Sequence, residues 1–373
     1  MWQRSAPRVR SDRRALGAAS PDDDELELLR AALLPGDDAR AAWTRWRATH
    51  DVDEASDRSY DVLPSIGATL PAVALGADQV RLRSLRSRNW VRNESLLRSL
   101  AVALDLLGEE GVPTLVVKGA ILVSQVYGEP GLRRMGDTDL VVGPDYSDRA
   151  VELLTTSGWR VKSRWIHATD LVDVQGHGLD VHRWPLFPRF TRRVESGWLD
   201  RCRQCVIAGA PTRRLALPDE LVLTVTHGLF AMPSRSMVRW PLDVAAILGS
   251  ADHAEFWPDV VRSADELQLG PIVAKGLGFC RQELALDVPP DILEGLRATR
   301  LDRWIAYQWW RRVRGSYPPM RIRRYVDLER AAGRRPTATG YATRRWDNLR
   351  RHGSAKVLQH RLRNLRTWGF RPE

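Results

Sequence analysis

The feature that most constrains the fold is a change of pattern near residue 112, from helical periodicity to a series of short apolar runs. Each run is short and contains β-branched or aromatic side chains, and turn residues separate several of them. We expect strands at residues 114–117, 137–142, 159–165, 171–175 and 179–184. Helices are expected at residues 120–127 and 147–157, with Ser147 as the cap of the second. This order predicts an α+β fold with a small mixed β-sheet, and not a β-α-β repeat.

Helical periodicity dominates on both sides of these runs. A long amphipathic helix is expected from Leu82 to Leu107, with Gly108 and Gly111 at its end. After the strands, we expect helices at residues 218–229, 241–248, 256–267, 272–286 and 301–314. The chain therefore divides into a disordered basic tail (1–22), a helical N-terminal region (23–110), a core with the sheet (111–210), a helical C-terminal domain (211–320) and a basic helical tail (321–373).

The charge of the chain favours anionic partners. Lysine and arginine number 57 against 46 acidic residues, a formal net charge of +11 over 373 residues, and such a balance attracts phosphates, nucleic acid or acidic surfaces. No apolar run is long enough to span a bilayer, and the arginine-rich start lacks the apolar segment of a secretory signal. We expect a cytoplasmic protein with no membrane partner. Cys202, Cys205 and Cys280 are expected to be ordinary thiols, because a zinc site would need further ligands.

The segment most informative about chemistry is Gly-Asp-Thr-Asp-Leu-Val-Val at residues 136–142. Asp137 and Asp139 are two apart on an expected strand, so their side chains project from the same face. Asp180 lies between two apolar residues on a later strand and supplies a third carboxylate. Carboxylates this close repel each other without a cation, and magnesium prefers oxygen ligands. We therefore predict that all three acids are catalytic residues and ligands of two magnesium ions, with manganese as an alternative, and that Asp180 is the base toward an acceptor hydroxyl.

A phosphate site is expected upstream of these acids. Lys118, Gly119 and Ala120 lie where a strand turns into a helix: the glycine admits close approach of a phosphate, the helix start attracts anions, and the lysine adds a charge. Arg133 and Arg134, in the loop before the acidic strand, are expected to bind phosphate oxygens. Each element alone has an ordinary explanation, such as a turn or an exposed basic face. Their order along the chain favours a nucleotide site.

In this order the segments resemble the uncharacterised nucleotidyltransferase family of the DNA polymerase beta superfamily. The resemblance rests on Lys-Gly-Ala at 118–120, Tyr127, Pro-Gly-Leu-Arg at 130–133, Gly-Asp-Thr-Asp-Leu-Val-Val at 136–142, Asp-x-His-x-Trp at 180–184, Leu-x-Leu-Pro-x-Glu at 215–220, His227, Trp240 and Asp243. It implies a mixed sheet, magnesium and a nucleoside triphosphate such as ATP, and it leaves the acceptor open. In one departure, Ala120 stands where many superfamily members have a phosphate-binding serine, and Lys118 is expected to substitute for it.

Three further residues have alternative roles. His182 lies two residues after Asp180, so we expect it on the same face, where it contacts the nucleotide or orients a ligand; a structural role is an equal alternative. His227 and Asp243 lie on expected helices, where packing or capping is favoured over catalysis.

These patterns favour an enzyme that moves a nucleoside monophosphate from a nucleoside triphosphate to an unidentified hydroxyl or phosphate on a small molecule, peptide or protein. The alternative is an RNA-binding or RNA-end-modifying protein that uses the arginine-rich residues 321–373. For that segment, a solvated or packed helical surface is the simpler explanation. A catalytically inactive homologue is disfavoured, because clustered carboxylates gain nothing without a metal.

Overall fold

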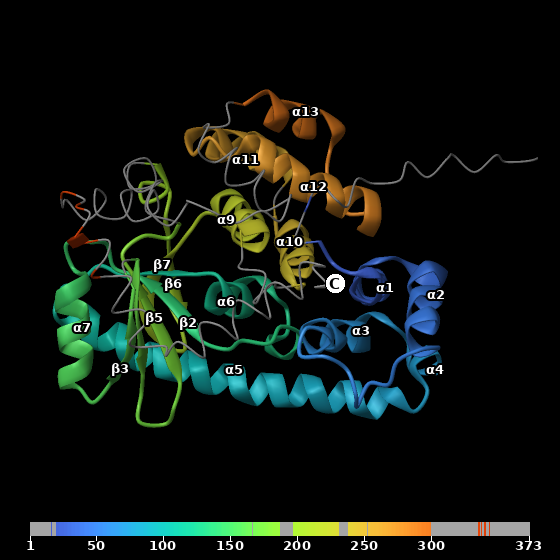
Figure 1. The fold of residues 1–373 in the computed structure, drawn as a ribbon, viewed down its shortest axis with the longest axis horizontal. Helices are drawn as coiled ribbons and strands as arrows, with labels where there is room; N and C mark the ends of the chain where they lie inside the picture. Colours follow the sequence, from blue (N-terminus) through green and yellow to red (C-terminus); the bar gives the residue numbers. More distant parts are fainter. Residues whose placement is uncertain are drawn as a thin grey trace, which may run out of the picture.

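The computed structural model describes residues 16, 20–165, 167–186, 197–230, 238–251 and 253–299, with five isolated positions between 335 and 343. Across these residues, helices surround a seven-stranded mixed sheet with the strand order β3-β4-β5-β2-β1-β7-β6 (Figure 1). The expected α+β fold, with helical segments before and after the sheet, is confirmed.

The elements follow the order expected from the sequence. The first helices are α1 (Asp23–Leu33), α2 (Gly36–Arg47), the short turn η2 (Ser59–Asp61), α3 (Leu63–Thr69), α4 (Ala72–Leu75) and α5 (Asp78–Glu109). The core contains β1 (Leu115–Val117), α6 (Gly119–Ile121), the π-helical turn η3 (Leu122–Val126), η4 (Pro130–Leu132), β2 (Thr138–Val141), α7 (Ser147–Thr156), β3 (Arg160–Arg164), β4 (Ala168–Val172), β5 (Gly178–His182), β6 (Arg203–Ile207) and β7 (Ala210–Arg214). The last described helices are α9 (Leu217–Phe230), α10 (Trp240–Gly249), α11 (His253–Glu266), α12 (Gly270–Leu284) and α13 (Pro290–Ala298).

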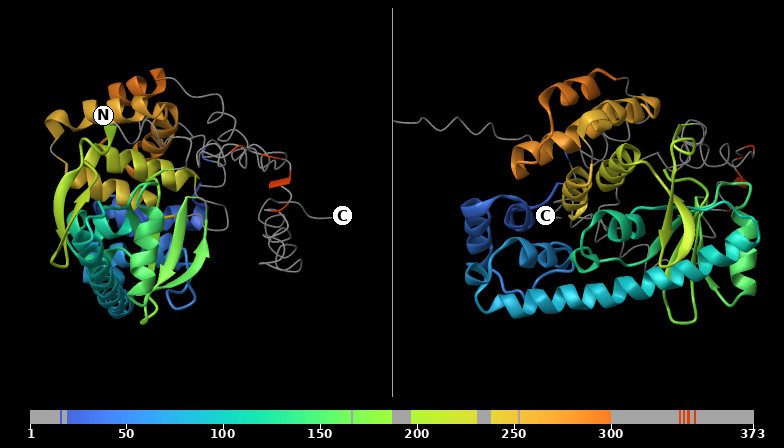
Figure 2. Two further views of the ribbon diagram at one scale, coloured as in Figure 1. Left: turned by 90° about the vertical axis from the view of Figure 1, so that its left-hand side faces the viewer. Right: turned by 180° about the vertical axis from the view of Figure 1, so that it is seen from behind.

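Helix α5 connects the N-terminal helices with the sheet. It runs past α3 and η4 and continues beneath the strands to α7, as the front and back views both show (Figures 1 and 2). Leu96, Leu100, Leu104 and Leu107 recur at helical spacing and are all buried in the cluster on the sheet. The apolar stripe seen in the sequence therefore fixes the helix against the strands.

Alternation along the strands divides the apolar core between two faces. Val116 and Leu140 are buried with α5 and α7, whereas Val117 and Val141 join the cluster that contains the C-terminal helices. Because side chains alternate along a strand, Asp139 projects from the same face as Val141. The acidic side of the sheet thus faces α9 and not α5.

The strand expected at residues 171–175 is β4, which lies three residues earlier. Asp173 begins a turn immediately after this strand, because its Oδ1 accepts the N–H groups of Gln175 and His177, each at 2.8 Å. An Asp that binds the backbone two and four residues ahead favours a turn over strand pairing. The apolar run at 171–175 predicted a strand through Asp173 and did not reveal that the Asp173 side chain would bind the backbone and form a turn.

Helix α7 occupies the expected residues, but its expected cap is wrong. Tyr146 holds the N-cap position and makes no side-chain capping bond. Ser147 lies inside the helix, where its Oγ donates to the carbonyl of Pro144 at 3.2 Å.

Strands β6 and β7 were missed, and so were the helices α3, α4 and α13, although these helices lie in regions expected to be helical. Strands β6 and β7 form a hairpin whose two-residue turn, Ala208-Gly209, has positive φ at both positions. β7 then pairs in parallel with β1 and widens the sheet. The helix expected at 301–314, nearly all of the tail at 1–22 and nearly all of the tail at 321–373 lie outside the described residues.

Candidate active site

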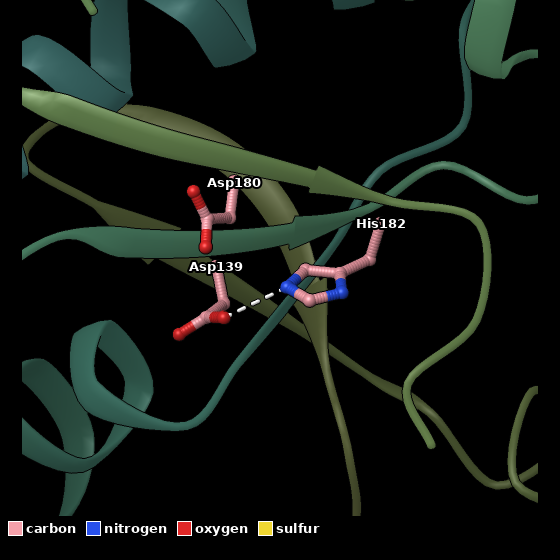
Figure 3. Close-up of side chains that lie close together, drawn as sticks. All are labelled: Asp139, Asp180 and His182. Atoms are coloured by element: carbon pink, nitrogen blue, oxygen red, sulfur yellow. Dashed lines mark hydrogen bonds and ion pairs between the residues drawn. The ribbon is translucent and has the colours of Figure 1, made fainter. Parts of the chain in front are cut away.

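Two acids from adjacent parallel strands lie opposite each other. β2 pairs with β5 in a register that places Asp139 beside Asp180, and His182 follows two residues later on the same face of β5. One ligand atom from each of these three side chains lies within 4.8 Å of the others. Figure 3 shows the three side chains gathered next to one another, with Asp139 joined to His182. Two carboxylates and an imidazole at this spacing can hold a metal ion.

The ammonium group of Lys118 brings a positive charge to this cluster. Its Nζ donates to Oδ1 of Asp139 at 2.6 Å, and the two side chains are 16% and 13% exposed. Burial alone would raise the pKa of Asp139, but Lys118 and His182 outweigh burial and hold this pKa well below its usual range. Burial and the charges of Asp139 and Asp170 raise the pKa of Asp180 to about 8. The acidic pair therefore favours a further cation beside Asp180.

Asp137 is not a member of the three-residue cluster that the structure brings together. It is exposed and precedes β2, and its Cβ lies 3.2 Å from the position that a Cβ on Gly178 would occupy. Burial and closer acids raise the pKa of Asp180, and the charge of Asp137 adds to this. Burial lowers the pKa of Lys118, but Asp139, with smaller contributions that include Asp137, outweighs burial and raises it. The geometry thus groups His182 with the two acids where the sequence suggested Asp137, and a ligand role for Asp137 stays a prediction.

His182 contacts one of the acids directly. Its Nε2 lies 2.8 Å from Oδ1 of Asp139, and its side chain is 9% exposed. Burial and the charge of Lys118 lower the pKa of His182, which favours the neutral ring. Its ring centroid lies 6.0 Å from that of His167. Of the roles left open by the sequence, this contact suits orientation of Asp139, and a contact to nucleotide stays a prediction.

The turn after β1 is strained at the lysine and not at the glycine. Lys118 has φ 58° and ψ −128°, a conformation that costs a residue with a side chain about 1–3 kcal/mol. Gly119 has no positive φ, but a Cβ there would lie 2.8 Å from Nη1 of Arg133 and 3.4 Å from Sδ of Met135. The lack of space beside Arg133 and Met135 therefore explains why a glycine occupies position 119. The nucleotide contacts of Gly119 and Ala120 stay predictions.

Arg133 is held in a buried ion pair and not in an open phosphate-binding loop. Its Nε donates to Oδ1 of Asp243 at 2.7 Å, its Nη2 donates to Oδ2 at 3.1 Å, and both side chains are 6% exposed. The hydroxyl of Tyr127 donates to the same Oδ1 at 2.9 Å. Only the third nitrogen, Nη1, lies toward Gly119. The side chain of Arg134 is 40% exposed, and its Nη1 lies 3.6 Å from Oδ1 of Asp57. A phosphate contact of Arg134 stays a prediction.

The comparison with known families agrees with this arrangement of the core. Residues 62–285, more than half of the chain, match the model of a family described as uncharacterised nucleotidyltransferase. The chain belongs to this nucleotidyltransferase family. Curated proteins gave no match.

Two solved structures resemble parts of this nucleotidyltransferase. An antigenic nucleotidyltransferase-like protein from Paracoccidioides brasiliensis is 18% identical, with a TM-score of 0.37 over 57% of this chain and 97% of that one. The antibiotic-resistance factor ANT(2'')-Ia is 14% identical, with a TM-score of 0.35 over 46% of this chain and 91% of that one.

The two helical residues with open roles, His227 and Asp243, are both part of the protein interior and have different charged neighbours. Asp243 pairs with Arg133, which is the packing role favoured by the sequence. His227 lies on α9, where burial and the charge of Lys118 lower its pKa to about 3, so its ring is neutral.

Among the described residues of the nucleotidyltransferase, no helix combines the length and the apolar character needed to cross a membrane.

Sequence reasoning gave no role to Glu220 and Tyr127, although both occur in the motifs that carry the family resemblance. Glu220 is completely buried, and its Oε1 accepts the N–H of Lys118 at 3.1 Å. Glutamate in the first turn of a helix is ordinarily explained by the helix dipole. The signal that distinguishes Glu220 is burial, which the sequence alone does not reveal.

Proposed function

We propose that this nucleotidyltransferase transfers a nucleoside monophosphate from a nucleoside triphosphate to a hydroxyl or phosphate group, with a divalent metal bound by Asp139 and Asp180. The observation that carries the proposal is the register of these two acids on adjacent parallel strands, with Lys118 bound to one of them. Their carboxylates repel each other, and the raised pKa of Asp180 reflects burial together with this repulsion. A bound cation would remove that cost.

The donors of the cluster suit magnesium. Magnesium takes one or two carboxylates together with substrate phosphates, and manganese accepts similar ligands. We assign Asp139 and Asp180 as ligands and Asp137 as a further carboxylate; His182 orients Asp139 through its 2.8 Å contact. When bound, the metal supplies activation of the attacking oxygen and charge stabilisation for the leaving pyrophosphate.

Asp180 is the proposed base. Its carboxylate lies beside Asp139 on the adjacent strand, next to the proposed metal, where it can accept a proton from an acceptor hydroxyl. In the reaction, the acceptor oxygen forms a bond to the α-phosphorus while the bond to pyrophosphate breaks. The proton of the acceptor hydroxyl passes to Asp180.

The turn after β1 is the proposed triphosphate site. Lys118 already carries its ammonium group to the acidic cluster, and a phosphate oxygen can replace Asp139 as its partner. Gly119 and Ala120 supply backbone N–H groups beside it, and Arg134 adds an exposed guanidinium in the loop before β2. The acceptor is proposed only as a small molecule, peptide or protein.

Labelled nucleotides test this proposal. The protein is incubated with Mg²⁺, a fractionated cell lysate and each of the four nucleoside triphosphates, labelled on either the α- or the γ-phosphate. We expect an acceptor to gain the α label and not the γ label. Asp139→Asn should abolish the transfer, whereas Asp148→Asn, which changes an acid on α7 that is 87% exposed, should not. Transfer of the γ label, or full activity of Asp139→Asn, would overturn the proposal.

A further inference from the structure

Glu220 is a buried carboxyl group, and among the described residues only one of its two oxygens is hydrogen-bonded. Its exposed fraction is 0%, and its Oε1 accepts the backbone N–H of Lys118 at 3.1 Å. Its Oε2 has no hydrogen-bond partner among the described residues. A buried polar atom without a partner costs stability. Such a residue at this position therefore needs an explanation beyond core packing.

Among the described residues, the hydrogen-bond partner of Glu220 is Lys118, which itself has a strained backbone. Lys118 adopts φ 58° and ψ −128°, and residues with a side chain keep such a conformation only where their surroundings enforce it. The N–H of Lys118 is fixed by Glu220, and its Nζ is fixed by Oδ1 of Asp139. One hydrogen bond thus joins the first turn of α9 to a residue that reaches the acidic cluster.

We propose that Glu220 is a positioning residue that holds the backbone of Lys118, so that its ammonium group stands beside Asp139 and is available to a triphosphate. The inference rests on the proposed function, because nucleotide binding is the reason it gives for fixing the backbone of Lys118. It also makes the helical region after the sheet part of the site, since the hydrogen bond spans 102 positions of the chain.

The neighbouring residue offers a matched control. Asp219 is also buried in the first turn of α9, with 1% of its surface exposed. It binds Arg201, through Nη2 at 2.9 Å and Nε at 3.2 Å, instead of Lys118. A change at Asp219 therefore perturbs the same helix turn and a buried acid without touching the strained residue.

Hydrogen exchange and nucleotide binding of a small variant series test the proposal. Glu220→Gln keeps an acceptor oxygen in place, Glu220→Asp withdraws it by one methylene, and Asp219→Asn is the control. Exchange is followed in the peptide that contains Lys118, and calorimetry with Mg²⁺ and α,β-methylene analogues of the four nucleoside triphosphates gives affinity. We expect Glu220→Asp to lose about tenfold or more in both amide protection and affinity, with Glu220→Gln and Asp219→Asn within about threefold of the parent.

A double variant separates positioning from general damage. If Glu220 acts through Lys118, Glu220→Asp should have no further effect on affinity in a Lys118→Met background. An equal loss in that background, unchanged protection and affinity in folded Glu220→Asp, or a tenfold loss in folded Glu220→Gln would each refute the inference. If the parent binds none of the four analogues, the proposed function fails, and the exchange data still decide whether Glu220 holds Lys118.

Discussion

Replacement of Lys118 by methionine removes the ammonium group from the acidic cluster while keeping a side chain of similar length. The pair that it breaks is largely buried, with Nζ and Oδ1 2.6 Å apart and side chains 16% and 13% exposed. Loss of one partner of a buried ion pair costs about 3–5 kcal/mol. His182 still binds Asp139 at 2.8 Å, so we expect the lower end, about 3 kcal/mol, in metal-free buffer.

A divalent ion should reverse this loss. In the parent, a metal has to compete with the ammonium group for Asp139, whereas in Lys118→Met this competition is absent. We expect Mn²⁺ to bind the variant about tenfold or more tightly, and a metal at a hundred times its Kd adds about 2.7 kcal/mol of stability. Urea unfolding followed by circular dichroism, with and without Mn²⁺, measures both effects.

Lys162→Met is the control, because Lys162 is exposed on β3. It should change neither stability nor the response to Mn²⁺. An equal response to Mn²⁺ in the parent and in Lys118→Met would refute the reasoning, since it would mean that the ammonium group and the metal do not share Asp139.

The remaining predictions concern stability, pH and nucleic acid. Asp243→Ala leaves Arg133 buried without its carboxylate and should lower the free energy of unfolding, measured by urea titration, by about 3–5 kcal/mol. Asp259→Ala changes an exposed pair and should cost less than about 1 kcal/mol in the same titration. Equal losses would contradict this prediction. Burial raises the pKa of Glu220 from 4.5 to about 8, so the folded protein retains a proton that the unfolded chain releases. The stabilising contribution of this proton is complete below pH 4.5 and is lost as the pH rises to 8. Between these values the free energy of unfolding should fall by about 1 kcal/mol per pH unit, and Glu220→Gln should remove this slope in unfolding titrations. If residues 321–373 bind RNA, filter binding should weaken steeply with salt, and no binding at low salt removes that alternative.

The parts of the fold that the sequence predicts are those fixed by local pattern. The leucine stripe of α5 and the apolar runs of β1, β2 and β5 are visible without tertiary information, because periodicity and β-branched content are local properties. Asp139 was expected on a strand two residues after Asp137, and Asp180 was expected between two apolar residues on a later strand, so both acids were predicted from local pattern. Their parallel register supports that expectation.

The features that the sequence does not predict depend on contacts between distant segments. Arg133 was expected to be open to phosphate, but Asp243, 110 positions away, pairs with it inside the protein. Glu220 has the appearance of an ordinary helix-start glutamate, and only the fold shows that it is buried against Lys118. The hairpin β6–β7 was missed because its first residues, Arg203 and Gln204, are exposed and polar.

Whether Asp139 and Asp180 share a metal can be seen by anomalous diffraction from crystals grown with Mn²⁺ and an α,β-methylene nucleoside triphosphate. We expect a manganese peak within coordination distance of both Asp139 and Asp180, with the triphosphate beside Lys118, and loss of the peak in Asp139→Asn. A nucleotide bound elsewhere, or manganese that never contacts these two acids, would contradict this expectation.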